Sequence, residues 1–345
     1  MMKVLKGETF NMEFFRPPKD GMLPKSDDGN QWRVFGKPIG KGGQGTVYLA
    51  ESINSPNKEP VVAKVLNPSR VIDGIPTDSH EIIIHRKFPD HRGIIKPYDA
   101  LIEPDPEKNS YLILEFAKHG DFSQLIPAEG MPPSIAVPLF VQVAEGLERV
   151  HGEGVVLKDM KPSNLLLAEN GAKISDFGSA EMSSDSDDPM IAGTPRYLAP
   201  EQFHGEGSTS ESDMYGAGVS LWESITGIRP FDGMSDTDIA MQKLTGTAVL
   251  PAASDVLDDD NAQLREISKQ IERLMQDNPE DRPTAHELSE ALVKSGERTR
   301  RTYIDLFVPE QRIVDIVAEL ASMGTRQETK VASDWQVSLL PDTTS

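Results

Sequence analysis

The sequence contains no cysteine, which excludes disulfides and thiolate metal sites. It has no apolar run long enough to span a bilayer, and its first residues lack the apolar core of a secretory signal. Basic residues are few: 35 Lys and Arg stand against 55 Asp and Glu, for a formal net charge of −20. This balance disfavours nucleic acid as a partner, because phosphate binding needs cationic surface, and otherwise serves solubility. We therefore expect an intracellular protein, cytoplasmic or nuclear, with no membrane span.

What the sequence has in ordinary amounts indicates a globular chain. Its 345 residues are 37% hydrophobic and 26% charged, which is typical of a folded domain with a large core. Nothing in the composition indicates an oligomeric state.

The most informative stretch runs from Val155 to Gly178. Two short apolar runs, residues 155–157 and 165–167, predict buried strands on either side of a polar loop. That loop and the turn after it carry Asp159, Lys161, Asn164 and Asp176. Carboxylate and amide oxygens can hold Mg²⁺, a further carboxylate can orient a hydroxyl nucleophile, and the lysine can neutralise a transferring phosphoryl group.

Asp159-Met-Lys-Pro-Ser-Asn164 followed by Asp176-Phe-Gly178 resembles the catalytic loop and metal-binding loop of eukaryotic protein kinases. The resemblance extends over about residues 32–294. It implies an α+β, two-lobed fold with a small antiparallel-sheet N-lobe that carries one main helix, and a larger, mostly helical C-lobe. One departure is plain, since the family's His-Arg-Asp triplet is here Leu157-Lys158-Asp159.

Upstream, Gly40-x-Gly42-x-x-Gly45 lies between alternating apolar residues and predicts a β-hairpin with glycines at its turn. A dinucleotide fold would place a helix directly after the glycines, whereas residues 46–50 continue as strand. A kinase-type phosphate loop is therefore favoured, with Val47 over the adenine. Lys64 lies in an apolar strand; it either faces solvent at a sheet edge or, as the resemblance implies, binds phosphate.

An acid on the following helix should pair with Lys64. Glu81 is the natural candidate, and Asp78 is better explained as a helix cap. The second of two predicted strands, residues 111–116, would end at the adenine hinge with Leu114 at the back pocket. Asp121 is either a ribose contact or a helix N-cap.

Further along, residues 134–151 have helical periodicity, with Pro138 tolerable only near the first turn. The stretch from Gly193 to Glu201 resembles the family's substrate-side loop, and its Thr194 would bridge Asp159 and Lys161. Asp213 would accept backbone N–H groups of the catalytic loop, and Arg282 would pair with Glu201. Lys161 and the loop around Thr194 together resemble serine/threonine kinases rather than tyrosine kinases.

The departures fall on packing and regulation. Leu157 replaces a packing histidine, and His85 stands where the family carries an apolar residue, so we predict that His85, Phe177 and Leu157 stack. Lys158 replaces an arginine that binds a phosphate on the activation loop, so we predict weak dependence on loop phosphorylation. The acidic run over residues 185–188 is either a stand-in for that phosphate or, more simply, a solvated loop.

Domain boundaries follow from composition and the extent of the resemblance. We predict an irregular N-terminal arm over residues 1–30 with order beginning near Trp32, and a kinase domain over 31–295 whose lobes meet near 116 and 117. A C-terminal extension, 296–345, has a short basic cluster at 298–301, a candidate helix at 309–323 and a disordered tail. The helix would either pack back on the domain, which is favoured, or recruit a partner.

These features predict an ATP-dependent serine/threonine protein kinase that uses Mg²⁺ and acts on protein substrates presenting Ser or Thr. The alternatives are a nucleotide-binding pseudokinase scaffold, which only Leu157 and Lys158 favour, and a small-molecule kinase. Substrate preference stays open, since an acidic channel from Asp121 and Glu223 is a weak signal. The catalytic residues are predicted to be Asp159, Lys161 and Thr194; the metal ligands Asn164 and Asp176; and the nucleotide-binding residues Ile39, Gly40, Gly42, Gly45, Val47, Ala63, Lys64, Glu81, Glu115, Ala117 and Asp121.

Overall fold

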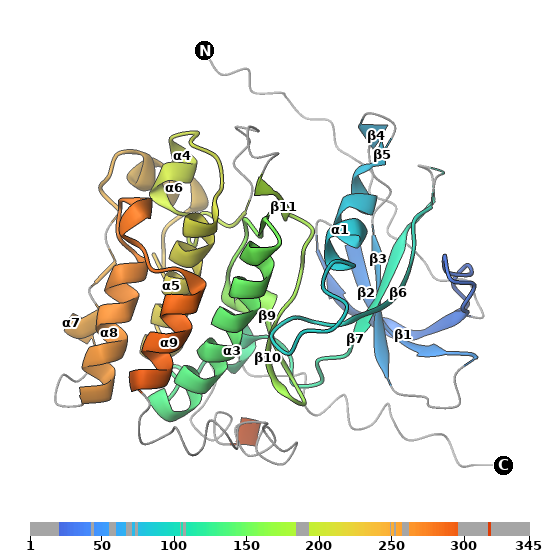
Figure 1. The fold of residues 1–345 in the computed structure, drawn as a ribbon, viewed down its shortest axis with the longest axis horizontal. Helices are drawn as coiled ribbons and strands as arrows, with labels where there is room; N and C mark the ends of the chain where they lie inside the picture. Colours follow the sequence, from blue (N-terminus) through green and yellow to red (C-terminus); the bar gives the residue numbers. More distant parts are fainter. Residues whose placement is uncertain are drawn as a thin grey trace. The chain divides into compact units, whose positions relative to one another are not determined.

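The computed structural model describes residues 21–42, 45–54, 60–66, 71–72, 75–103, 105, 108–183, 193–248, 250–251, 253–256, 262–295 and 317–318. Its backbone forms two compact units (Figure 1). The N-terminal unit comprises Met1–Arg86 and Pro97–Phe116, and the C-terminal unit comprises Lys87–Lys96 and Ala117–Ser345. An antiparallel sheet dominates the first and helices dominate the second, which confirms the predicted α+β, two-lobed class.

The N-terminal unit is built on a five-stranded antiparallel sheet in the order β1-β2-β3-β7-β6. Its strands are β1 (Trp32–Lys41), β2 (Gly45–Ser52), β3 (Val61–Leu66), β6 (Pro97–Leu101) and β7 (Tyr111–Glu115). All six residues of β3, which lies between β2 and β7, are buried. The helix α1 (Thr77–His85) and the two-residue strands β4 (Val71–Ile72) and β5 (Ile75–Pro76) complete the unit.

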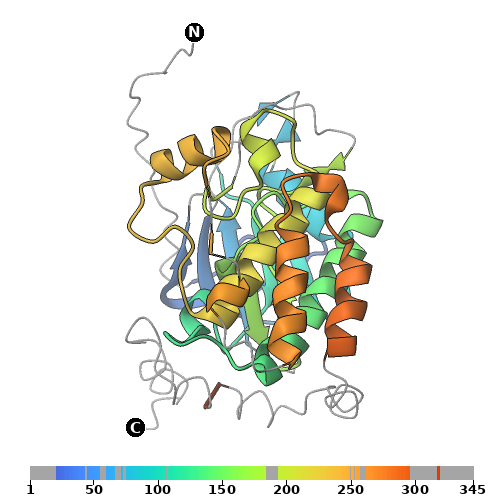
Figure 2. The ribbon, with the colours of Figure 1, turned by 90° about the vertical axis from the view of Figure 1, so that its left-hand side faces the viewer.

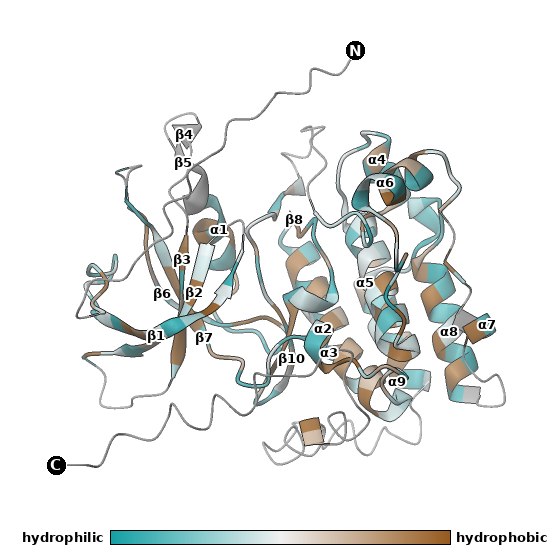
Figure 3. Cartoon of the chain, turned by 180° about the vertical axis from the view of Figure 1, so that it is seen from behind, coloured by the Kyte–Doolittle hydropathy of each residue, from teal (hydrophilic) through white to brown (hydrophobic). Residues whose placement is uncertain are grey.

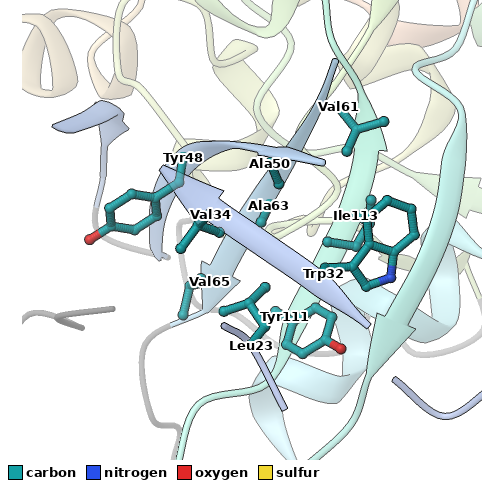
Figure 4. Packing of buried hydrophobic residues seen from close by; sticks show 10 residues of the cluster. All are labelled: Leu23, Trp32, Val34, Tyr48, Ala50, Val61, Ala63, Val65, Tyr111 and Ile113. Atoms are coloured by element: carbon teal, nitrogen blue, oxygen red, sulfur yellow. The ribbon is translucent and has the colours of Figure 1, made fainter. Parts of the chain in front are cut away.

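One face of this sheet carries a hydrophobic cluster, shown in Figure 4. The cluster includes Leu23, which is 2% exposed, although Leu23 lies in the segment predicted to be an irregular arm. Of that arm the structure describes residues 21–30, where Leu23 N–H donates to the carbonyl of Trp32 at 3.0 Å and Tyr111 donates its hydroxyl to the carbonyl of Pro24 at 2.7 Å. The prediction that order begins near Trp32 is therefore wrong, because an apolar residue among Pro, Lys and Asp packs on the sheet.

The C-terminal unit is organised around long helices. The helix α3 (Pro133–Gly152) packs along α9 (Ala285–Ser295), and α5 (Ser210–Thr226) packs on α8 (Ala262–Leu274); Figure 2 shows these helices side by side. Teal and brown segments alternate along α8 in Figure 3, as expected for a helix with one buried face. The shorter helices of the C-terminal unit are α2 (Phe122–Leu125), α4 (Pro200–Phe203), α6 (Asp236–Leu244), α7 (Ala253–Val256) and the 3₁₀ turns η1 (Pro162–Asn164) and η3 (Pro279–Asp281).

Four short strands hold the loops of this unit. The strands β9 (Leu165–Ala168) and β10 (Gly171–Ile174) form an antiparallel hairpin, and β8 (Val155–Val156) pairs with β11 (Glu181–Met182). The predicted strand 155–157 is thus one residue shorter, while 165–167 continues to Ala168. The predicted helix over 134–151 is confirmed as α3, with Pro138 in its second turn, where no N–H is present to bond the carbonyl of Ser134.

Several predicted features lie outside the described residues. They are residues 1–20 of the arm, the acidic run 185–188, the basic cluster 298–301, the tail 325–345, and the candidate helix 309–323 apart from residues 317 and 318, which are helical. No helix among the described residues is both long and apolar enough to cross a membrane.

Candidate active site

The β1–β2 hairpin in the N-terminal unit carries the three predicted phosphate-loop glycines. Gly42 N–H donates to the carbonyl of Gly45 at 2.9 Å and closes the described part of the turn. A Cβ added at Gly45 would lie 2.5 Å from the carbonyl oxygen of Val65, whereas none of the atoms in the described structure lies within 4 Å of a Cβ at Gly42. Packing of β2 on β3 thus explains the glycine at 45, whereas the described structure shows no packing contact that requires a glycine at 42.

Lys64 lies in the middle of β3, and α1 supplies its partner. Lys64 is 9% exposed and Glu81 is 4% exposed, and Lys64 Nζ lies 2.6 Å from Glu81 Oε1. The structure thus pairs Lys64 with Glu81, as predicted. A charge this deeply buried persists only with a partner of opposite sign.

The other predicted nucleotide-binding residues of this unit lie on the same sheet. Val47 on β2 is the cross-strand neighbour of Lys64, and Ala63 is fully buried beside it. Ile39, Val47 and Glu115 are half-buried, and Leu114 is 7% exposed at the end of β7. Ala117 and Asp121 belong to the C-terminal unit.

The predicted catalytic residues form a closed set of contacts in the C-terminal unit. Lys161 Nζ lies 2.6 Å from Asp159 Oδ2 and donates to Thr194 Oγ1 at 2.8 Å. Thr194 donates to Asp159 Oδ1 twice, from its backbone N–H at 2.9 Å and from its hydroxyl at 3.0 Å. Residues 35 positions apart in the chain are thus held together, and Asp159 remains half-buried rather than sealed.

Asp213, in the first turn of α5, supports the catalytic loop from below. It is 2% exposed and accepts the backbone N–H groups of Leu157 at 2.8 Å and Lys158 at 2.9 Å. Gly216, one turn further, lets the helix approach, because a Cβ there would lie 2.9 Å from atoms of Met160. The loop is therefore fixed by a buried carboxylate and by close backbone packing.

The predicted metal ligands come from η1 and from the segment after β10. Asn164 donates its amide to the carbonyl of Asp159 at 2.8 Å, which directs the amide nitrogen inward and leaves its oxygen for a cation. Ser175 N–H donates to the carbonyl of Asn164 at 2.9 Å and brings Asp176 to the same loop. Among the described residues no three acidic, His or Cys side chains gather to hold a metal by themselves. The oxygen donors present fit Mg²⁺ with further ligands from phosphate.

Lys158 has a partner that the sequence did not indicate. Its side chain is 7% exposed and its Nζ lies 2.6 Å from Glu181 Oε2 on β11. The pairing of β11 with β8 places Glu181 opposite Val156, two residues before Lys158 in the chain. Lys158 also has a positive φ of 67°. A sequence signal for Glu181 was absent, because this contact depends on a two-residue strand pair.

The predicted stack of His85, Phe177 and Leu157 would join the two units and stays a prediction. All three residues are buried; His85 belongs to the N-terminal unit, and Phe177 and Leu157 belong to the C-terminal unit. In the C-terminal unit Phe177 stacks on Phe88, with ring centroids 5.4 Å apart and an interplanar angle of 27°.

One further predicted structural contact is confirmed, and another contact was missed. Arg282 binds both carboxylate oxygens of Glu201, at 2.6 and 2.8 Å, and both side chains are buried. Missed was His151 at the end of α3, whose Nε2 lies 3.0 Å from Asp213 Oδ2. The sequence signal for this contact was the position of His151 in the last turn of the predicted helix, shortly before β8 and the loop of Asp159.

The two residues of the suggested acidic channel are both engaged in local structure. Asp121 occupies the N-cap position of α2, and its carboxylate accepts hydrogen bonds from the side chains of Ser123 and Gln124. Burial raises the pKa of Asp121. Glu223 is 4% exposed and accepts the hydroxyl of Tyr197 at 2.7 Å. Asp121 thus lies at the predicted N-cap position, and its ribose contact stays a prediction.

Comparison with known proteins agrees with this geometry. The family model described as "Protein kinase domain" matches residues 33–292. The chain belongs to the protein kinase family. Aurora kinase of Schizosaccharomyces pombe is 33% identical to it over 267 residues, 74% of this chain and 72% of that protein. Serine/threonine-protein kinase PkaA of Streptomyces coelicolor is 30% identical over 277 residues, 74% of this chain and 48% of that protein.

A further bacterial relative, serine/threonine-protein kinases PknA of Corynebacterium glutamicum, is 32% identical over 217 residues, 59% of this chain and 45% of that protein. The chain thus spans about half the length of these bacterial relatives. Their names support the serine/threonine type within the kinase family.

Proposed function

We propose that this kinase-family chain transfers the γ-phosphoryl group of ATP to Ser or Thr hydroxyls of protein substrates. The observation that carries the proposal is the contact set of Asp159, Lys161 and Thr194. It puts a carboxylate and an ammonium side by side at a half-buried position, next to a loop that resembles the family's substrate side. Such a pair suits proton acceptance from a hydroxyl together with charge neutralisation on phosphate.

The roles follow from the chemistry of each group. The substrate hydroxyl oxygen forms a bond to the γ-phosphorus while the bond to the leaving phosphate oxygen breaks, and Asp159 accepts the hydroxyl proton. Lys161 offsets charge on the transferring group, and Thr194 keeps both side chains in register. Binding of nucleotide falls to Lys64, held by Glu81, and to the loop of Gly40, Gly42 and Gly45.

The remaining nucleotide contacts are carried over from the resemblance. Mg²⁺ would be held by Asn164 and Asp176 and would neutralise phosphate charge when bound. The adenine and ribose contacts are proposed for Ile39, Val47, Ala63, Glu115, Ala117 and Asp121.

We further propose that activity depends weakly on phosphorylation of the loop after Asp176. The Lys158–Glu181 pair supports this, because a buried carboxylate already neutralises the lysine that replaces the family's phosphate-binding arginine. The acidic run 185–188 is then not needed as a stand-in. The intracellular location expected from the lack of cysteine remains part of the proposal.

Incubation with labelled ATP, Mg²⁺ and a generic protein substrate tests the function. We expect label on Ser and Thr of the protein substrate, lost in Asp159→Ala and kept in Asp232→Ala, which changes an exposed acid on the same unit. Nucleotide binding with equal background label in all three proteins would identify a scaffold. Label transferred only to small hydroxyl compounds in a lysate extract would identify a small-molecule kinase.

A further inference from the structure

Lys243, near the end of α6, is buried in a shell of rings and carbonyls. It is 1% exposed. Its Nζ lies 5.1 Å from the centroid of the Tyr215 ring, 5.4 Å from that of Phe231 and 5.9 Å from that of Phe203. The ammonium donates to the carbonyls of Arg196, at 3.2 Å, and Leu198. This surrounding suits a cation, because ring faces and carbonyl oxygens are both electron-rich.

The two carbonyls that Lys243 holds belong to the loop that begins at Thr194. Other contacts fix the same segment: Arg196 donates its guanidinium to the carbonyls of Pro230, Phe231 and Met234 at 2.6–2.8 Å, and Tyr197 donates its hydroxyl to Glu223. Thr194 itself contacts Asp159. The helices α4 and α6 lie side by side in Figure 1, so Lys243 reaches the loop just before α4 begins. We call the contacts of Lys243 with the carbonyls of Arg196 and Leu198 the clamp. The clamp therefore holds the same loop whose Thr194 contacts Asp159.

Holding a charge at this position is costly, which argues against a role in stability alone. Burial lowers the pKa of Lys243 from 10.5 to about 7. The charged and titratable groups facing it are Glu201 on α4, which favours its charge, Arg282 after η3, which opposes it, and Tyr215 on α5. Glu201 is already bound by Arg282, so no dedicated carboxylate neutralises Lys243 within the described contacts. An apolar side chain of similar volume would fill the site at lower cost.

We propose that the Lys243 ammonium is a positioning residue that fixes Arg196 to Leu198 for docking of the protein substrate. The proposal rests on the proposed kinase function. It assigns Lys243 to recognition of the polypeptide acceptor and leaves nucleotide binding to the N-terminal unit. Deprotonation leaves two N–H donors but removes the attraction of the cation to the three rings, so the clamp weakens as the charge is lost.

Steady-state kinetics of Lys243→Met test the proposal, with Lys269→Met as the matched control on an exposed helix position. We expect KM for a histidine-free peptide acceptor to rise about ten- to a hundredfold, the range that a small misplacement of groups costs. KM for ATP and turnover of ATP without peptide should stay unchanged. In the wild type KM for peptide should rise as the pH passes through 7, and in Lys243→Met it should not. Equal effects on peptide and ATP, or a pH profile shared by both proteins, would overturn the proposal.

Hydrogen–deuterium exchange separates this proposal from the kinase function itself. We expect faster exchange in peptides covering residues 193–203 of Lys243→Met, with unchanged exchange in α3 and α5 and an unfolding temperature no lower than that of wild type. Loop exchange as slow as in Lys269→Met would refute the positioning role even in a protein without activity. If the wild type shows no Asp159-dependent phosphoryl transfer and the loop still exchanges faster in Lys243→Met, the kinase function is refuted and the positioning of the loop by Lys243 is supported.

Discussion

Thr194 contacts both Asp159 and Lys161 through one hydroxyl. Thr194→Val keeps the shape but removes a donor to Asp159 and an acceptor for Lys161. A hydrogen bond to a charged group contributes about 1.5–3 kcal/mol, so kcat should fall at least about tenfold. Thr194→Ser retains the hydroxyl and should keep most of kcat. Equal turnover of the Val and Ser variants in a peptide phosphorylation assay would contradict the role given to this hydroxyl.

The Lys64–Glu81 pair allows catalysis and stability to be separated. Glu81→Leu leaves the buried Lys64 ammonium without its carboxylate and should lower the free energy of unfolding by about 3–5 kcal/mol. Lys64→Met together with Glu81→Leu removes both charges and should recover most of that loss. Urea denaturation measures both.

Activity should not recover in the double variant, because the Lys64 ammonium that we propose binds phosphate is gone. A double variant as unstable as Glu81→Leu would show that the pair does not act as a unit. Phosphoryl transfer restored along with stability would remove Lys64 from the nucleotide site.

For contacts between single residues, the sequence predicted those whose partners lie in motifs and missed those whose partners do not. Asp159 with Thr194, and Glu201 with Arg282, were predictable because each partner lies in a recognisable stretch. Glu181 and Lys243 lie in stretches without a motif, and their partners are fixed only by the packing of short elements. A lysine on an amphipathic helix is normally solvated, so its burial could not be read from the pattern.

Among the elements, those with strong periodicity were predicted and those fixed by tertiary contacts were not. The β1–β2 hairpin and α3 follow the patterns of their own residues. By contrast β8 and β11 have two residues each and exist because they pair with each other. The helix α1 ends at His85, and Phe88, three residues further along the chain, belongs to the C-terminal unit and stacks on Phe177.

The β8–β11 pair carries the prediction about phosphorylation. Changing Ser183, Ser184 and Ser186 together to Ala should leave most of the activity, because Glu181 already neutralises Lys158. Glu181→Gln leaves a buried lysine without its carboxylate and should reduce the free energy of unfolding by about 3 kcal/mol, and activity with it. Activity that vanishes in the triple Ala variant and persists in Glu181→Gln would reverse the assignment.

For the whole molecule, Lys243 couples stability to pH. Its pKa is about 7 in the folded protein and 10.5 ordinarily, so between these values the unfolded chain binds a proton that the folded chain does not. Stability from this group therefore rises with pH across that window. From pH 7 to 9.5 the unfolding free energy of wild type should gain on that of Lys243→Met by a few kcal/mol, on the order expected from 1.36 kcal/mol per pKa unit. Denaturant titrations of both proteins at pH 7 and pH 9.5 measure this change. A difference in unfolding free energy that is the same at both pH values would contradict the burial of the charge.

The extent of the N-terminal unit is the last point at which composition and structure disagree. The Pro, Lys and Asp of residues 21–30 are typical of an irregular segment, yet Leu23 is 2% exposed in the core cluster and Asp27 lies 2.9 Å from Arg86. A single apolar residue in a polar stretch gives no periodic signal, although its burial removes as much surface as one in a strand. Leu23→Ala should therefore cost about 2–4 kcal/mol of unfolding free energy, whereas Lys25→Ala, at an exposed neighbouring position, should cost little. Equal unfolding free energies of the two variants would instead support an ordered domain that begins near Trp32, because in a segment without core contacts neither substitution would change stability.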